Sequence, residues 1–168
     1  SRTNAGLDAI STFRKMLIYE RAGDRFMVML SAGNLSISQS VREILQTEAI
    51  RDPESGDPIT IWNAKSMFDA AQVLGAAVRH ISQRDGAALR QSGLEFNVSL
   101  ILGGQIAGGK MGLYLIYGQG NFIECGSDTP YLQIGELKYG KPILDRALHS
   151  STSLSEAVKL GLISFDST

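Results

Sequence analysis

The chain has 168 residues, which is enough for one domain with a hydrophobic core. Its 16 basic and 17 acidic residues give a net charge of −1, which excludes the strongly basic surface typical of partners of nucleic acids or anionic membranes. The single cysteine, Cys125, excludes an internal disulfide, and no apolar run approaches the roughly 20 residues needed to span a bilayer. We therefore expect one cytoplasmic domain over residues 1–168.

A β-hairpin is predicted near the start of the chain. Two runs rich in apolar residues, Phe13–Tyr19 and Arg25–Leu30, flank a turn that contains Gly and Asp. Strand alternation places Lys15 on the same face as Leu17 and Tyr19. An unpaired ammonium on that face is costly, so Lys15 is the residue that most needs an explanation.

The next segment is helical. Residues 31–34 break the second strand, and apolar residues then recur at helical spacing from Leu35 to Ala49. The stretch Arg51–Pro58 is a polar loop with two prolines. A second helix follows over Met67–Ile81, with small residues crowding its middle, which suits close packing.

The remainder returns to strands and then to helices. Three predicted strands, Glu95–Leu102, Gly112–Tyr117 and Asn121–Cys125, are joined by glycine-rich turns and indicate a meander. Pro142 suits a first helical turn, and Ser153 opens a capping-box pattern at the start of a final helix. The predicted order β-β-α-α-β-β-β-α-α argues against a doubly wound parallel sheet.

Several short motifs carry a family resemblance. They are Ser1–Gly6, Phe13–Met16 and Ser31–Gly33, followed in the same order by Leu102–Gly104, Gly112–Tyr114 and the stretch from Ser153 to Asp166. Together they resemble the proteasome β-subunit superfamily of N-terminal-nucleophile hydrolases, and most of all its bacterial Anbu (ancestral β-subunit) branch. The resemblance runs over nearly the whole chain.

The resemblance implies an α+β fold, a four-layer α-β-β-α sandwich of antiparallel sheets. It also implies that residues 1–168 are a single proteasome-type domain that is incomplete at both ends, lacking the first and the last strands. The family's nucleophile, a Thr or Ser, heads a strand upstream of the loop that contains Ser1, so we expect the nucleophile upstream of this chain. Ser1 itself is then a loop residue.

Four residues match supporting positions of the family's catalytic site. Lys15 lies beside the nucleophile and helps lower its pKa, and the backbone N–H at Gly33 donates to the oxyanion. Ser127 and Asp166 match positions that support the α-amine of the nucleophile, which acts as the base. Other interpretations remain open: Lys15 as a strand lysine with a solvated head, Ser127 as a turn or capping residue, and Asp166 as a surface acid at a helix end.

Other chemistries fit poorly. The segment Gly104–Lys110 has the spacing of a phosphate loop, but a strand follows it instead of a helix, so we predict a strand-connecting turn. His80 and His149 are isolated, and the acids of the Arg51–Pro58 loop lack ligand spacing, so no metal or cofactor is expected. We interpret His80 as a partly buried packing residue and Cys125 as a core residue. No GxSxG motif is present for a Ser-His-Asp hydrolase.

We therefore predict a peptidase subunit that acts on peptides or unfolded proteins and assembles as a homo-oligomer, whether or not an ATPase partner exists. Two rivals remain: a non-catalytic assembly protein of the same fold, and a small-amide hydrolase of the same superfamily.

Overall fold

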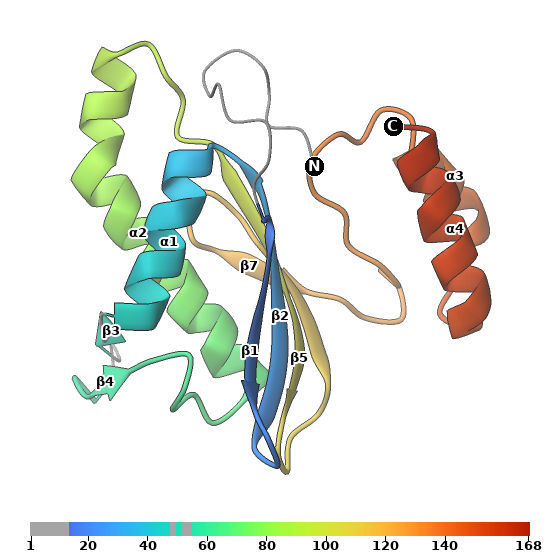
Figure 1. Ribbon diagram of the computed structural model, residues 1–168, viewed down its shortest axis with the longest axis horizontal. Helices are drawn as coiled ribbons and strands as arrows, with labels where there is room; N and C mark the ends of the chain where they lie inside the picture. Colours follow the sequence, from blue (N-terminus) through green and yellow to red (C-terminus); the bar gives the residue numbers. More distant parts are fainter. Residues whose placement is uncertain (1–13, 48–49, 52–54) are drawn as a thin grey trace. The chain divides into compact units, whose positions relative to one another are not determined.

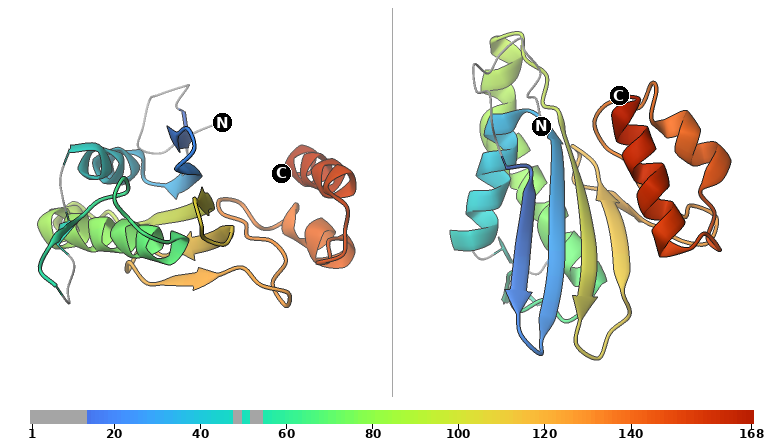
Figure 2. Two further views of the ribbon diagram at one scale, coloured as in Figure 1. Left: turned by 90° about the horizontal axis from the view of Figure 1, so that it is seen from below. Right: turned by 45° about the vertical axis from the view of Figure 1, so that its right-hand side comes forward.

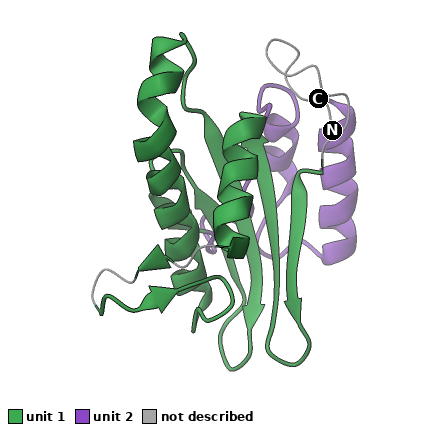
Figure 3. Ribbon diagram, turned by 60° about the vertical axis from the view of Figure 1, so that its left-hand side comes forward, with its two compact units in different colours: residues 1–124 green, residues 125–168 purple. Residues whose placement is uncertain are grey.

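The computed structural model describes residues 14–47, 50–51 and 55–168. The predicted loop at residues 1–6, Phe13 and two of the acids of the polar loop lie outside the described residues. The chain divides into two compact units, residues 1–124 and residues 125–168 (Figure 3). Among the described residues, no helix is long and apolar enough to cross a membrane.

The first unit is built on one antiparallel sheet of five strands, in the order β1-β2-β5-β6-β7. The strands are β1 (Met16–Arg21), β2 (Arg25–Gly33), β5 (Val98–Ile106), β6 (Gly112–Ile116) and β7 (Phe122–Glu124). The predicted hairpin is confirmed by the pairing of Met16 with Leu30 through Arg21 with Arg25. The predicted meander is confirmed as well, because β5 pairs with β6 and β6 with β7.

Strand β2 runs three residues beyond the predicted end at Leu30. Its last residues pair with the start of β5, Ser31 with Leu100 and Gly33 with Val98. These partners lie more than 60 residues away in the sequence, so local periodicity gives no sign of them. The segment 104–110 is a strand-connecting turn as predicted, since β5 continues to Ile106 and β6 begins at Gly112.

Two helices, α1 (Leu35–Thr47) and α2 (Met67–Gln91), lie on one face of the sheet (Figure 1). Their apolar stripes meet the inward side chains of the strands in one core. Helix α2 begins with a capping box between Ser66 and Asp69 and is ten residues longer than the predicted stretch. A two-stranded pair, β3 (Ile50–Arg51) and β4 (Pro58–Ile59), stands where we predicted only a loop.

The opposite face of the five-stranded sheet is apolar too. The side chains that point away from the helices include large ones that are 37–53% exposed: Met16, Ile18, Phe26, Leu30 and Ile123. Figure 2 shows the sheet edge-on, with α1 and α2 on one side of it. Among the described residues of this unit, one helix layer and one main sheet are present.

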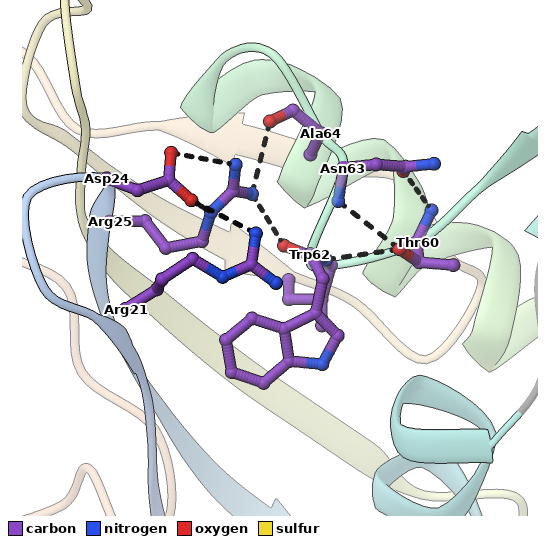
Figure 4. Close-up of polar contacts among 8 residues, drawn as sticks. Arg21, Asp24, Arg25, Thr60, Trp62, Asn63 and Ala64 are labelled. Atoms are coloured by element: carbon purple, nitrogen blue, oxygen red, sulfur yellow. Dashed lines mark hydrogen bonds and ion pairs between the residues drawn. The ribbon is translucent and has the colours of Figure 1, made fainter.

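The far end of the hairpin is fixed by a buried arginine. Arg25, whose side chain is 6% exposed, pairs with Asp24 at 2.7 Å. Its Nη1 donates to the carbonyl oxygens of Ile61 at 2.9 Å and Ala64 at 3.2 Å (Figure 4). The arginine thus ties the β1–β2 turn to the loop that leads into α2.

The second unit contains two helices, α3 (Lys141–Ala147) and α4 (Leu154–Asp166). The capping box predicted at Ser153 is confirmed, with its side chain accepting from the N–H of Glu156. An apolar stripe on α4 is strongly exposed, from 54% at Val158 to 82% at Leu154 and Phe165. Within this unit, Lys141 and Tyr131 both bond the carboxylate of Asp145.

Candidate functional site

The candidate site lies where β1 begins and β2 ends. Lys15 directly precedes β1, and its carbonyl oxygen accepts the N–H of Ser31 at 3.0 Å. The strand register therefore extends one residue beyond Met16, and Lys15 stands opposite Ser31. Lys15 is half-buried, and it continues the alternation that buries Tyr19 on the helix-covered face.

Gly33 is the diagonal neighbour of Lys15, two residues beyond Ser31 on β2. Such diagonal pairs lie about 7–8 Å apart. Because Ser31 donates its N–H toward Lys15, alternation along the strand directs the N–H of Gly33 to the same side of β2. The structure thus brings together Lys15 and the backbone amide of Gly33, two of the four residues predicted from the sequence.

The backbone at Gly33 requires glycine. Its φ is +100°, a left-handed conformation that side chains rarely adopt, and an added Cβ would run into the carbonyl of Asn97. The predicted strand break at residues 31–34 was therefore placed too early: residues 31–33 still pair with β5, and the strand ends at Gly33, where the close approach of Asn97 requires glycine.

The amino end of helix α1 contributes a positive electrostatic potential near Gly33. The helix begins at Leu35, two residues after Gly33, and its first turn contains no acidic residue. The amino end of a helix carries a partial positive charge, which stabilises a nearby negative charge. An oxyanion near the Gly33 amide would lie within reach of this potential.

The other two predicted residues belong to the second unit. Ser127 is exposed in a tight turn closed by Gly126 and Thr129, whose N–H and C=O groups bond each other at 3.1 and 3.2 Å. Asp166 is the exposed last residue of α4. Each position agrees with the simpler interpretation as a turn residue or a helix-end acid, and the roles near an α-amine stay predictions.

Two predictions about individual side chains were wrong. His80 is exposed on α2, because it lies six residues past the buried Leu74 and so roughly 120° around the helix from it. Cys125 is half-buried, and its Sγ lies 2.7 Å from the carbonyl oxygen of Thr129 in the same turn. It therefore belongs to a turn and not to a core.

Asn34, which the sequence pattern marks only as part of a strand break, lies beside Gly33 at this site. Its side-chain Nδ2 donates to the carbonyl oxygen of Glu95 at 2.9 Å, across 61 residues of sequence. Among the described residues, no group of three or more His, Cys, Asp or Glu side chains is arranged to hold a metal ion.

Solved structures of Anbu proteins are similar to this chain over almost its full length. Anbu from Yersinia bercovieri is 50% identical with a TM-score of 0.85, and the match covers 100% of this chain and 68% of that one. The helical assembly of the Anbu complex from Pseudomonas aeruginosa is 46% identical with a TM-score of 0.85, covering 99% and 67%. Anbu from Hyphomicrobium sp. strain MC1 is 44% identical with a TM-score of 0.82, also covering 99% and 67%.

No protein-family model and no curated protein matches the chain. The structural matches carry the assignment, because their identities of 44–50% extend over at least 99% of this chain. The chain spans about two thirds of the length of each of these solved proteins. It belongs to the Anbu family of ancestral β-subunits, whose fold is proteasome-like.

Proposed function

We propose that the protein is a proteasome-type peptidase subunit that hydrolyses peptide bonds with an N-terminal Thr or Ser nucleophile. The observation that supports the proposal is the pairing of Lys15 with Ser31, which makes the half-buried Lys15 a diagonal neighbour of Gly33 across β1 and β2. The nucleophile is carried on a strand upstream of Ser1, at the edge of the sheet where Lys15 lies.

The proposed reaction has two steps. The α-amine of the nucleophile takes the proton of its hydroxyl, and the oxygen attacks the peptide carbonyl carbon. The Lys15 ammonium favours the deprotonated oxygen, and the Gly33 N–H donates to the negative carbonyl oxygen of the tetrahedral intermediate. The C–N bond then breaks, and the proton passes to the leaving amine. Water, activated by the same α-amine, hydrolyses the ester that remains.

Ser127 and Asp166 have a secondary role in this proposal. Asp166 holds the protonated α-amine electrostatically, and the Ser127 hydroxyl orients it by a hydrogen bond. Both side chains are exposed in the second unit and are not packed in a hydrophobic core, so their polar groups are accessible.

We also propose that the whole protein has the four-layer α-β-β-α architecture. The sheet of the first unit is covered by helices on one face and presents apolar side chains on the other. Helix α4 of the second unit presents an apolar stripe of its own. The solved relatives are longer than this chain by about half, and further strands would form a second sheet over the apolar face of the first unit's sheet.

Homo-oligomerisation belongs to the same proposal. The Pseudomonas aeruginosa relative is described as a helical assembly, and a net charge of −1 gives little electrostatic self-repulsion. Sedimentation or light scattering of the full-length protein at micromolar concentration should detect an oligomer, and a strict monomer would contradict this part of the proposal.

The test of the function is hydrolysis of fluorogenic peptides by the full-length protein, compared with Lys15→Ala. We expect turnover that falls by several powers of ten in the variant, with an unchanged melting temperature. Turnover of small amides without peptides would favour the small-amide hydrolase. No turnover of either class by an intact oligomer would favour the non-catalytic assembly protein.

A further inference from the structure

Asn34 holds the chain immediately after Gly33 against the entrance of β5. Its backbone N–H donates to the carbonyl oxygen of Asn97 at 2.8 Å. Its side-chain Nδ2 donates to the carbonyl oxygen of Glu95 at 2.9 Å. One residue therefore makes two hydrogen bonds to the same short segment, which lies more than 60 residues away in the sequence.

The same residue starts helix α1. The carbonyl oxygen of Asn34 accepts the N–H of Ser38 at 3.1 Å and the hydroxyl of Ser38 at 3.0 Å. Asparagine is a favoured residue at this position because its side-chain oxygen accepts amides of its own helix, and serine or aspartate serves equally well. A capping oxygen does not need the amide nitrogen, and the side-chain bond that Asn34 makes uses that nitrogen, toward Glu95.

Asn34 follows Gly33, and glycine has the greatest backbone freedom of all residues. Glycine populates more of the backbone dihedral space than any other residue, and Gly33 sits in the left-handed region. On its N-terminal side it is held by the pairing of β2 with β5. On its C-terminal side, Asn34 supplies the bonds that set the direction of the chain.

We infer that Asn34 is a positioning residue that fixes the backbone amide of Gly33. The inference rests on the proposed function in one respect, namely that this amide is the oxyanion donor. Electrostatic stabilisation of a transition state depends on donors that are already in place before the reaction. A misplacement of about 1 Å can cost on the order of 100-fold in rate.

The first experiment measures amide hydrogen exchange in the full-length protein. Asn34→Asp keeps the shape of the side chain but replaces the Nδ2 donor to Glu95 by an acceptor. Asn34→Ser removes Nδ2 and leaves only a shorter hydroxyl. We expect the protection factors of amides at residues 32–36 to fall by about tenfold, with no change in α2 or β6. Asn63→Ser is the matched control, because the Nδ2 of Asn63 also donates to a backbone carbonyl, that of Pro58 at 3.0 Å. Unchanged protection at residues 32–36, or an equal fall in the control, would overturn the inference.

The second experiment measures peptide hydrolysis by the same variants. We expect kcat to fall by roughly 10- to 100-fold with KM unchanged, since the amide acts in the transition state. Faster exchange without a change in kcat would overturn the catalytic part. If the wild-type protein hydrolyses no peptide, the proposed function fails, while the exchange measurement still decides whether Asn34 fixes Gly33.

Discussion

Gly33 lies so close to the carbonyl of Asn97 that no side chain fits between them. The contact joins the end of β2 to the residue before β5, and it combines with a φ of +100° that already disfavours any other residue. The position is therefore restricted twice, by conformation and by space.

Gly33→Ala should consequently be more damaging than an ordinary glycine substitution. We expect a loss of roughly 2–4 kcal/mol in the free energy of unfolding of the full-length protein, measured with urea. Gly23→Ala is the control, because Gly23 has a φ of +76° with nothing within 4 Å of its added Cβ; its cost should be about 1 kcal/mol. Equal losses in the free energy of unfolding for the two variants would mean that the backbone of Asn97 shifts at little cost to make room for a Cβ.

Arg25 predicts a second large effect on stability. Its guanidinium is buried and bonds both Asp24 and two backbone carbonyls. Arg25→Met removes these bonds and leaves the carbonyls of Ile61 and Ala64 without their donor, so we expect a loss of about 2–4 kcal/mol in the free energy of unfolding.

The control for Arg25 is Arg84→Met, since Arg84 forms an exposed pair with its neighbour Asp85 at 2.8 Å. Exposed pairs of this kind contribute about 0–1 kcal/mol. Similar urea midpoints of unfolding for the two variants would show that the hydrogen bonds of Arg25 to the loop before α2 contribute little to stability.

The Asp145 cluster predicts a pH dependence in the second unit. The hydrogen bond from Lys141 is the main cause that lowers the pKa of Asp145, and the bond to Asp145 raises the pKa of Lys141. Burial is the main cause that raises the pKa of Tyr131. The Asp145 contribution is therefore present above its unfolded pKa of about 4 and is lost as pH falls through the folded value. The contributions of Lys141 and Tyr131 are present below their unfolded pKa values, about 10, and are lost as pH rises through the folded values.

Titration of the Asp145 carboxyl by NMR checks this sign. In Lys141→Met the pKa of Asp145 should rise toward its ordinary value, since the hydrogen bond from Lys141 that mainly lowers it has been removed. Lys138→Met is the control, because the Lys138 ammonium lies over the Tyr139 ring at 5.0 Å. A pKa of Asp145 that is the same in all three proteins would contradict the assignment.

Helix α4 offers a test of the four-layer architecture. Val158 and Ile163 are 54% and 51% exposed, but they lie roughly 140° apart around the helix. Val158 belongs to the apolar stripe with Leu154, Leu162 and Phe165, whereas Ile163 does not. If further strands cover the stripe, Val158→Asp should destabilise the full-length protein by about 2–4 kcal/mol and Ile163→Asp by less than about 1 kcal/mol. Small and equal changes in melting temperature would count against a covered stripe.

Much of the local structure could be predicted because it is encoded in short-range patterns. Alternating apolar residues marked the hairpin, and the Ser153 capping box marked the start of α4 within one residue. The turn at residues 104–110 was predicted because a strand pattern, and no helix pattern, follows it.

Contacts between residues that are far apart in the sequence could not be predicted from such local patterns. The pairing of β2 with β5 joins segments more than 60 residues apart, and an Asp-Arg pair in a turn normally lies at the surface. The carbonyl oxygens that accept hydrogen bonds from the buried Arg25 belong to the loop before α2, so the sequence around Arg25 does not predict them. Asn34 was missed for the same reason, because the carbonyl oxygen of Glu95 that its side chain bonds lies 61 residues away.

The four predicted site residues differ in how much of their placement the sequence pattern could predict. Lys15 and Gly33 could be related because they lie on strands that adjoin in sequence, so the hairpin register connects them. Ser127 and Asp166 follow from the family resemblance alone, since their residue types are equally common in turns and at helix ends.

The most direct measurement compares fluorogenic-peptide hydrolysis by the full-length protein and by the 168-residue chain, each with and without Ser1→Ala. The proposed nucleophile lies upstream of Ser1, and the ammonium of Lys15 and the amide of Gly33 are proposed to assist it. We therefore expect turnover by the full-length protein that Ser1→Ala leaves intact, and none by the 168-residue chain. Equal activity of both proteins, abolished in both by Ser1→Ala, would show that Ser1 is the nucleophile and would contradict the account.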